Sequence, residues 1–212
     1  MSKAKFNKPN DELQGASVIA GSDKLVFAND IAFDIETAPL KSDGEEASLL
    51  DPTTARVAAI GYYEPTKGRF FISYDKDEKA MLCQFWGVFI WIHAAGYKMI
   101  GFNCHGFDLP FIIRRSWFHG IEVPQGVMTS GGRYWGETFI DLMIVWRCGS
   151  WKEFISLDSL ARYLGVGEKT GSGEKFYRLW NTNRQAAVDY LVNDVRITLN
   201  CADKMGVIAK CA

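Results

Sequence analysis

Apolar residues form short dense runs up to about residue 74, and helical repeats predominate after it. The runs are rich in Val, Ile, Phe and Tyr, which favours β-strands. A polar segment with Pro and Gly over residues 37–55 predicts a long loop between two of them. The expected strands cover residues 25–29, 31–36, 56–63, 69–74 and 98–103.

Apolar residues three and four positions apart predict helices in the remaining segments. The clearest repeat begins near Asp77 or Glu78 and ends at Gly96; it carries Met81, Leu82, Phe85, Val88, Phe89 and Ile92. Further helices are expected over residues 107–120, 156–165 and 184–205, with residues 165–175 as a loop. Strands first, then strands alternating with helices, predict an α/β domain with a central mixed sheet flanked by helices.

The length and composition are those of one packed domain. The chain has 212 residues, of which 48% are hydrophobic, enough for a sizeable core. We expect residues 1–22 to be a flexible N-terminal arm and residues 23–212 to form a single domain. The formal net charge is −1, so binding to nucleic acid would depend on a local groove and metal ions.

The cysteines and the apolar stretches indicate the compartment. Five widely spaced cysteines without a CxxC pair argue against a disulfide framework or a zinc site and favour a reducing environment. The polar N-terminal segment is not a signal peptide, and the apolar stretch from Met81 is too short to span a bilayer. We expect a cytoplasmic protein that does not associate with membranes.

Four acidic residues stand out from this pattern. Asp34 and Glu36 lie two apart on an expected strand, so both side chains point to one face. Asp108 follows a buried strand, and Asp194 lies in a helix one turn after Tyr190. Taken alone, Asp108 or Asp194 is a helix cap or a solvated charge. The Asp34–Glu36 pair is harder to explain, because buried like charges need a cation, and carboxylates suit Mg²⁺ or Mn²⁺.

Three motifs that contain these acids occur in the order of a known superfamily. They are "FDIET" with Asp34 and Glu36, "GFNCHGFDLPFI" with Asp108, and "YLVNDV" with Tyr190 and Asp194. The chain resembles the DEDD 3′–5′ exonucleases, in particular the stand-alone enzymes related to the proofreading domain of family-B DNA polymerases. Tyr190 stands four before Asp194 and Asp189 five before it, which is typical of the tyrosine subgroup rather than the histidine subgroup.

The resemblance implies a ribonuclease H-like fold and two divalent ions, Mg²⁺ or Mn²⁺. It implies that Asp34, Glu36 and Asp194 hold one ion, that Asp34 bridges to a second, and that Asp108 acts on the second directly or through water. Two ions roughly 3.5–4 Å apart stabilise the attacking and the leaving oxygen of an in-line displacement. Tyr190 would orient the attacking water, since a phenol is protonated at neutral pH.

An exonuclease must also hold a single-stranded 3′ end, through stacking aromatics and cations. We expect Thr37, Ala38, Asn103 and Phe107 to contact the terminal nucleotides. Candidate phosphate contacts, for which an ordinary surface charge is the competing interpretation, are Arg114, Arg115, Lys169, Lys175 and Arg178. His105 lies within the second motif and Asp141 lies after it. We expect structural roles for both.

Three functions remain open at this stage. The leading hypothesis is hydrolysis of single-stranded DNA from its 3′ end with release of nucleoside 5′-monophosphates. RNA 3′-end trimming is an alternative, since contacts to the 2′-hydroxyl decide between the two. A non-catalytic nucleic-acid-binding or polymerase-accessory module is the third, although such a module usually lacks one of the four acids. The expected partners are nucleic acid, with DNA favoured over RNA, and a separate polymerase or repair complex.

Overall fold

A seven-stranded mixed sheet forms the centre of the protein. The computed structural model describes residues 12–13, 16–19, 29–40, 48–64, 69–74, 77–128, 136–150, 152–171 and 176–208. The strand order is β1-β2-β5-β4-β3-β6-β7. The strands are β1 (Glu12–Leu13), β2 (Ala16–Ile19), β3 (Ile31–Pro39), β4 (Ala55–Glu64), β5 (Arg69–Tyr74), β6 (Met99–Gly101) and β7 (Phe139–Asp141).

The strand β3 lies in the interior of the sheet, between an antiparallel and a parallel neighbour. β3 pairs antiparallel with β4 on one side and parallel with β6 on the other. β4 and β5 continue as an antiparallel pair, whereas β6 and β7 are parallel. The predicted mixed sheet is therefore confirmed.

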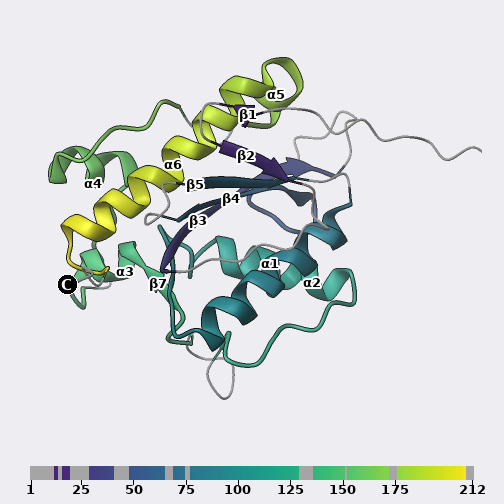
Figure 1. Cartoon of the computed structure of the whole chain (residues 1–212), viewed down its shortest axis with the longest axis horizontal. Helices are drawn as coiled ribbons and strands as arrows, with labels where there is room; N and C mark the ends of the chain where they lie inside the picture. Colours follow the sequence, from purple (N-terminus) through teal and green to yellow (C-terminus); the bar gives the residue numbers. More distant parts are fainter. Residues whose placement is uncertain are drawn as a thin grey trace, which may run out of the picture.

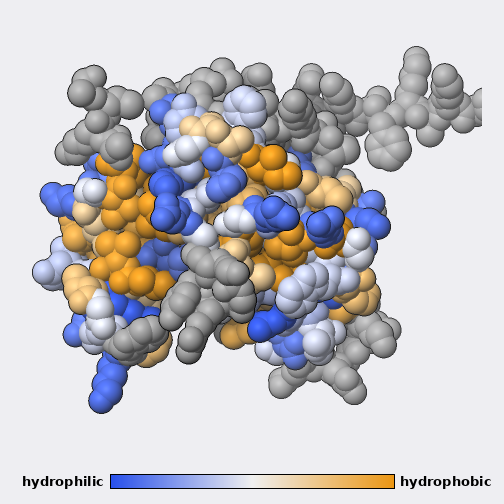
Figure 2. All heavy atoms as spheres, turned by 90° about the horizontal axis from the view of Figure 1, so that it is seen from below, coloured by the Kyte–Doolittle hydropathy of each residue, from blue (hydrophilic) through white to orange (hydrophobic). Residues whose placement is uncertain are grey.

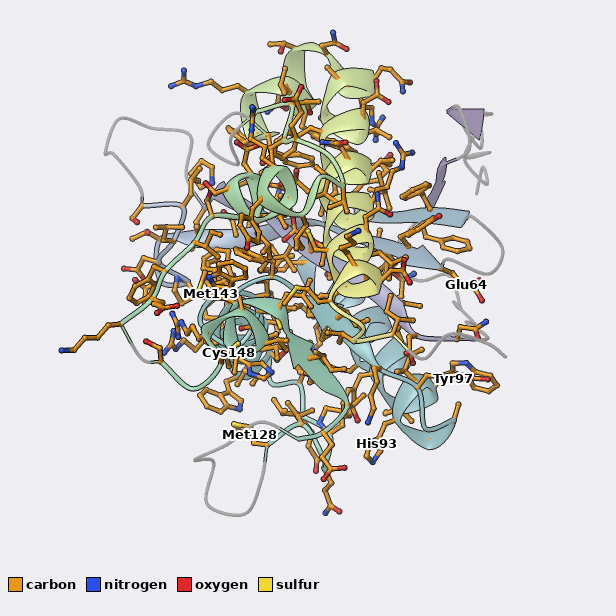
Figure 3. All side chains as sticks on the ribbon, turned by 90° about the vertical axis from the view of Figure 1, so that its left-hand side faces the viewer. Glu64, His93, Tyr97, Met128, Met143 and Cys148 are labelled. Atoms are coloured by element: carbon orange, nitrogen blue, oxygen red, sulfur yellow. The ribbon has the colours of Figure 1, made fainter. Side chains whose placement is uncertain are left out.

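Helices cover both faces of this sheet. In Figure 1, α5 and α6 cross the upper face, and α1 and α2 lie below the sheet. In Figure 3, the labels Met143 and Cys148 show where the short helix α3 lies; Cys148 is its C-terminal cap. The helices are α1 (Glu78–Ala94), α2 (Asp108–Phe118), α3 (Leu142–Arg147), α4 (Leu157–Leu164), α5 (Phe176–Thr182) and α6 (Arg184–Lys204).

The local signals in the sequence explain where the longer helices begin and end. The Asp77 side chain accepts a hydrogen bond from the Ala80 amide and caps α1. Ser156 caps α4 in the same way, and Gly165 ends α4 in the left-handed conformation. The predicted helices over 77–96, 107–120, 156–165 and 184–205 are confirmed to within a few residues.

Several short elements were not predicted. β7, α3 and α5 are three to seven residues long, too short to show a periodicity of their own. β3 continues to Pro39, so the loop expected from residue 37 begins later. The strand expected over 25–29 falls largely outside the described residues. Residues 12–13 and 16–19 of the expected arm form β1 and β2 at the sheet edge, and the division into an arm and a domain at residue 22 stays a prediction.

The lower face of the molecule carries a buried ion pair and exposed apolar side chains. Glu78 and Arg115 are 5% and 3% exposed, and Arg115 Nη2 lies 2.6 Å from Glu78 Oε2. Arg115 is therefore neither the surface charge nor the phosphate contact that the sequence suggested; its guanidinium fixes α2 against α1 below the sheet. Figure 2 shows apolar residues gathered on this face. Ile90 of α1 and Trp117 of α2 are among the exposed apolar residues of the protein. No helix in the described part of the chain combines the length and the apolarity needed to cross a bilayer.

Candidate metal centre

The central strand β3 brings two carboxylates to the face covered by α6. Asp34 and Glu36 are two residues apart and point to the same side of the sheet. On the neighbouring strand β4 they stand opposite Gly61 and Ala59. These two small residues leave room above β3, so the acidic side chains and a helix can share the space over the sheet. Glu36 is 5% exposed, and Asp34 is partly buried.

Helix α6 supplies the third carboxylate from above. The helix packs on β3 and β4 through an apolar stripe that includes Leu191 and Val195. A Cβ at Gly61 would lie 2.8 Å from Leu191 Cγ and 3.2 Å from Val195 Cγ1, so the absence of a side chain there sets how closely α6 approaches. Asp194, between these two residues in sequence, is 1% exposed and points at the acids of β3.

The oxygens of these three acids come together. One carboxylate oxygen from each of Asp34, Glu36 and Asp194 lies within 4.8 Å of the others. The sequence predicted these three residues as ligands of one ion, and the structure brings them together from β3 and α6. No other group of three His, Cys, Asp or Glu side chains within the described ranges meets this spacing.

Asp108 contacts the same strand, β3, from the start of helix α2. It is the first residue of α2, where a negative charge is favoured by the helix dipole. Its Oδ1 accepts a hydrogen bond from the Ile35 amide at 3.1 Å, between the two acids of β3. A hydrogen bond also joins the carboxyl groups of Asp34 and Asp108. All four predicted acids therefore lie in one cluster, with Asp108 at its edge.

Burial raises the pKa of every carboxyl group in the cluster, and repulsion between the acids of the cluster raises the pKa of Asp34 and Glu36 further. Burial, followed by the charges of Asp108 and Asp194, raises the pKa of Asp34 well above its usual range. Burial and the charge of Asp34 do the same to the pKa of Glu36. For Asp108, burial outweighs the hydrogen bond from Ile35 and raises the pKa to about 7. The ionised cluster is thus costly without a cation.

A lysine from the loop after α4 partly offsets this cost. Lys169 Nζ lies 2.6 Å from Asp194 Oδ2 and 5.4 Å from the centre of the Tyr190 ring. The loop is held in place because the Lys169 amide donates to Asp158 Oδ1 of α4 at 2.8 Å. The sequence suggested Lys169 as a phosphate contact or as an ordinary surface charge. Its place beside Asp194 depends on how the loop folds over α6, which no local pattern indicates.

The donor set fits a divalent metal ion. Three carboxylates converge on one point, and one ammonium group cannot balance them. No hydrogen bond of good geometry reaches Asp194 Oδ1 from the residues that the structure describes, although the side chain is almost fully buried. Carboxylate oxygens are the ligands that Mg²⁺ and Mn²⁺ prefer, and cysteine and histidine are absent from the cluster.

Tyr190 lies one helical turn before Asp194 and beside the cluster. The residue is 4% exposed, and a Cβ at Gly171 would lie 3.3 Å from its ring, so the loop after α4 covers it. Burial, followed by the charges of Asp194 and Glu36, raises the pKa of its hydroxyl. The phenol is therefore protonated at all ordinary pH values and can donate a hydrogen bond.

The expected substrate-binding residues surround the cluster at different depths. The Thr37 hydroxyl donates to the Leu49 carbonyl at 2.8 Å, and Ala38 is fully buried in β3. Asn103 adopts a left-handed conformation with φ 57° in the turn after β6. Phe107 is partly buried against the Phe111 ring. Their contact with a nucleotide stays a prediction.

Asp141 has the structural role expected of it. Its carboxylate accepts hydrogen bonds from the amides of Asn103, His105 and Met143 at 2.8–2.9 Å. The side chain thereby caps α3 and fixes the turn that carries the second motif. Among the candidate cations, Arg114 and Arg178 are exposed, and Lys175 lies outside the described residues.

Comparisons with known proteins agree with this geometry. Residues 52–200 match the model of a family described as "Predicted 3′-5′ exonuclease related to the exonuclease domain of PolB". The matched segment contains Asp108, Tyr190 and Asp194 and begins after Asp34 and Glu36. No curated protein matches the chain.

A solved structure shows the same fold. The family B DNA polymerase from the hyperthermophilic archaeon Pyrobaculum calidifontis aligns with a TM-score of 0.62 and 24% sequence identity, over 82% of this chain. The chain spans 24% of the length of that polymerase. The predicted ribonuclease H-like α/β fold is therefore confirmed.

Proposed function

Because the chain belongs to the family of predicted 3′–5′ exonucleases related to the exonuclease domain of PolB, we propose that it is a metal-dependent 3′–5′ exonuclease. It hydrolyses phosphodiester bonds at the 3′ end of single-stranded nucleic acid and releases nucleoside 5′-monophosphates. The observation that carries the proposal is the convergence of Asp34, Glu36 and Asp194 within 4.8 Å, with Asp108 hydrogen-bonded to the strand between them.

The four acids are the proposed holders of two divalent ions, Mg²⁺ or Mn²⁺. Asp34, Glu36 and Asp194 would hold one ion, and Asp34 with Asp108 would hold the other. Bound there, such ions polarise the scissile phosphate, lower the pKa of the attacking water and stabilise the leaving oxygen. The carboxyl groups would bind the ions in their ionised form: burial, followed by repulsion between the acids, raises the pKa of Asp34 and Glu36, and a bound cation favours loss of their protons.

Tyr190 and Lys169 have supporting roles in this proposal. The Tyr190 hydroxyl stays protonated, so it orients the attacking water by a hydrogen bond rather than by taking its proton. This role assigns the chain to the tyrosine subgroup of DEDD exonucleases. The Lys169 ammonium, 2.6 Å from Asp194 Oδ2, supplies a further positive charge where the transition state gains negative charge.

The proposed substrate is a single-stranded 3′ end, with DNA favoured over RNA. Thr37, Ala38, Asn103 and Phe107 lie on β3 or in the turn after β6, next to the acids, and are the proposed contacts to the last nucleotides. A separate polymerase or a repair complex is the proposed partner, since the chain spans only 24% of the length of the family B DNA polymerase that it resembles.

Release of mononucleotides tests the proposal. Single-stranded DNA and RNA of one sequence are incubated in parallel with Mg²⁺ or Mn²⁺, and the products are quantified by chromatography. We expect nucleoside 5′-monophosphates from DNA at the higher rate, and a loss of at least about a hundredfold in rate for Asp194→Asn. Asp189→Asn, an exposed acid on the same helix, is the matched control and should keep full activity.

Three results would count against the proposal. Intact substrate with both metals and both nucleic acids, together with retained binding, would favour the non-catalytic module. Products with 3′-phosphates would exclude the proposed chemistry. Faster hydrolysis of RNA than of DNA would reassign the substrate to RNA while leaving the metal-dependent reaction in place.

A further inference from the structure

A polar and aromatic pocket lies on the same face of the sheet as the acid cluster. Its volume is about 480 Å³, within the usual range for small-ligand sites. It opens between the strands β4 and β5 and the helix α5, which packs against β3 and α6. The lining residues are Arg56, Ala58, Tyr74, Phe176, Tyr177, Trp180, Asn181 and Arg184.

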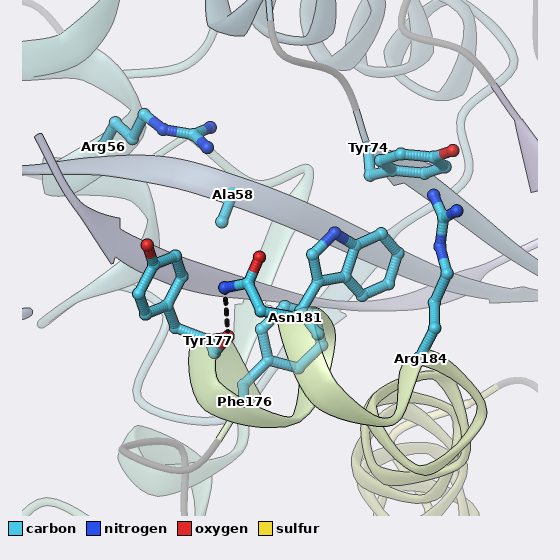
Figure 4. A pocket seen from close by; sticks show the side chains of 8 residues that line it. Arg56, Ala58, Tyr74, Phe176, Tyr177, Asn181 and Arg184 are labelled. Carbon is cyan, nitrogen blue, oxygen red and sulfur yellow. Dashed lines mark hydrogen bonds between the residues drawn. The ribbon is translucent and has the colours of Figure 1, made fainter. Parts of the chain in front are cut away.

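Two arginines make the pocket positive. Arg56 comes from β4, and Arg184 is the first residue of α6. Figure 4 shows the two arginines on opposite sides of the view, with Asn181 between them. Neither guanidinium lies within ion-pair distance of an acidic side chain that the structure describes. The lining contains no acidic residue, so its chemistry suits an anion.

Aromatic rings fix one of the arginines. The Arg184 guanidinium lies 4.3 Å from the centre of the Tyr74 ring and 4.7 Å from that of Trp180. A guanidinium stacked on rings keeps the N–H groups at its edge free for a phosphate. Phe176 is buried and stacks on the Trp180 ring, which leaves the partly buried Tyr177 ring of the lining to pack against a nucleobase. A planar base joined to a phosphate matches this combination.

The pocket is built on the same strand pair and the same helix as the acid cluster. Arg56 stands opposite Ala38 in the β3–β4 register, next to the positions that face Glu36 and Thr37. Along α6, Arg184 precedes Asp194 by ten residues, or roughly 15 Å at 1.5 Å per residue. That distance corresponds to about four stacked nucleotides at 3.4 Å each.

We propose that this pocket binds a nucleotide unit of the substrate strand, about four positions on the 5′ side of the bond that is cut. The base packs on the Tyr177 ring, and the phosphate pairs with Arg56 and Arg184. The inference rests on the proposed exonuclease function, because it names where the same strand continues. A free nucleotide shares this chemistry, and the experiment separates the two sources.

Binding of oligonucleotides in EDTA tests the pocket without cleavage. Fluorescein-labelled oligodeoxythymidylates of two and eight nucleotides are titrated with the full chain, and anisotropy gives Kd. We expect Arg56→Ala and Arg184→Ala each to weaken binding of the eight-mer about tenfold and to leave the two-mer unchanged. The slope of log Kd against log salt should fall by about 0.7 for each arginine removed, the value for one phosphate contact to a single strand.

Arg196→Ala is the matched control. Arg196 is an exposed arginine of the same helix that also lies over an aromatic ring, Phe70, at 4.8 Å, and it does not line the pocket. It should change neither the affinity nor the salt slope. Arg184→Lys keeps the charge and should keep the salt slope while weakening the stacking; thermal melts check that every variant is folded.

Two outcomes would overturn the inference. Folded Arg56→Ala and Arg184→Ala variants that bind the eight-mer as Arg196→Ala does would exclude a strand contact. Thymidine 5′-monophosphate that competes as strongly as the eight-mer would show a site for free nucleotides instead. Mononucleotide release, measured with Mg²⁺ or Mn²⁺ on the same protein preparations, keeps the exonuclease proposal separate. Release by the wild type, together with unchanged eight-mer binding in the two pocket variants, contradicts the pocket alone.

Discussion

At the scale of single residues, the fold holds acidic side chains close enough to repel one another. Asp34, Glu36 and Asp194 converge in a region with little water, and ionised carboxylates there repel one another. Lys169 forms an ion pair with Asp194, which lowers the cost without removing it. Buried like charges of this kind are retained where a ligand compensates them.

The titration of Asp108 predicts how the stability of the metal-free protein depends on pH. Burial raises its pKa to about 7, so between about pH 4 and pH 7 the folded chain holds a proton that the unfolded chain has released. Unfolding then releases a proton, and the free energy of unfolding must fall as the pH rises through this window. The contribution of Asp108 is roughly 4 kcal/mol at most.

Urea unfolding in EDTA at pH 5 and pH 8 measures this effect. Asp108→Asn keeps an oxygen acceptor for the Ile35 amide but carries no titrating proton. We therefore expect the variant to lose less stability than the wild type between the two pH values. Equal losses in the two proteins would contradict the assignment of the titration to Asp108.

On the opposite face of the sheet, breaking the Glu78–Arg115 pair should cause a large loss of stability. Both side chains are almost fully buried, so Glu78→Gln leaves a guanidinium without its counter-charge at a cost of about 3–5 kcal/mol. Burial favours a raised pKa for Glu78, but hydrogen bonds from Arg115 and His119 outweigh it and lower the pKa. The pair therefore stabilises the fold above about pH 4.5, and this contribution is lost as the pH falls through the lowered pKa.

Equilibrium unfolding of Glu78→Gln and of Arg162→Ala compares a buried pair with an exposed one. Arg162 is 58% exposed where it pairs with Asp158, and its removal should cost less than about 1 kcal/mol. Similar losses for the two variants would contradict the role given to the buried pair.

At the scale of elements, the packing of α6 on β4 sets the geometry of the acids. Gly61 lies under Leu191, and an added Cβ would meet its Cγ at 2.8 Å. Gly61→Ala should therefore push the helix away from the sheet and destabilise the fold by about 1–3 kcal/mol. Since Asp194 is on the same helix, the variant should also bind Mn²⁺ more weakly, as measured by calorimetry.

Gly87→Ala provides the comparison for this substitution. Gly87 is exposed on α1, and nothing lies within 4 Å of its added Cβ. Alanine in that helix interior should raise stability by about 0.5–1 kcal/mol and leave Mn²⁺ affinity unchanged. A Gly61→Ala protein as stable as Gly87→Ala would show that α6 does not depend on this close approach.

The elements that sequence patterns predicted are those with a strong local signal. The caps Asp77, Ser156 and Gly165 and the apolar stripes of α1 and α6 are local features, and the helices that they predict are present. The order of three sequence motifs predicted the four acids as metal ligands, and the structure brings their side chains together. β7 and α5 are too short to carry a periodicity, so their positions depend on tertiary packing.

The predictions that did not hold concern residues whose role depends on the partner across the fold. Arg115 was a candidate for phosphate binding, but Glu78, which lies 37 residues earlier, pairs with it. Lys169 was a candidate phosphate contact or surface charge, and the sequence did not indicate the ion pair that it forms with Asp194. The pocket under α5 combines residues of two strands and two helices, and no single segment of sequence contains its pattern.

At the scale of the whole molecule, metal binding should couple to folding. A cation that binds the folded cluster and not the unfolded chain stabilises the protein by about 2.7 kcal/mol at one hundred times its Kd. For a chain of this size this corresponds to a rise in Tm of roughly 5–11 °C. We expect Mg²⁺ or Mn²⁺ to give this rise in the wild type and a much smaller one in Asp34→Asn; a Tm that ignores both metals would contradict the metal centre.

The central claim is that the acid cluster cuts nucleic acid from its 3′ end, and one measurement tests it most directly. A single-stranded DNA with a 5′ fluorescent label is incubated with the protein and Mg²⁺ or Mn²⁺, and products are resolved on a denaturing gel over time. The account predicts a ladder that shortens one nucleotide at a time with the label retained, and no ladder with Asp34→Asn or in EDTA. Release of the labelled 5′ nucleotide at the outset, or a ladder that Asp34→Asn leaves unchanged, would contradict it.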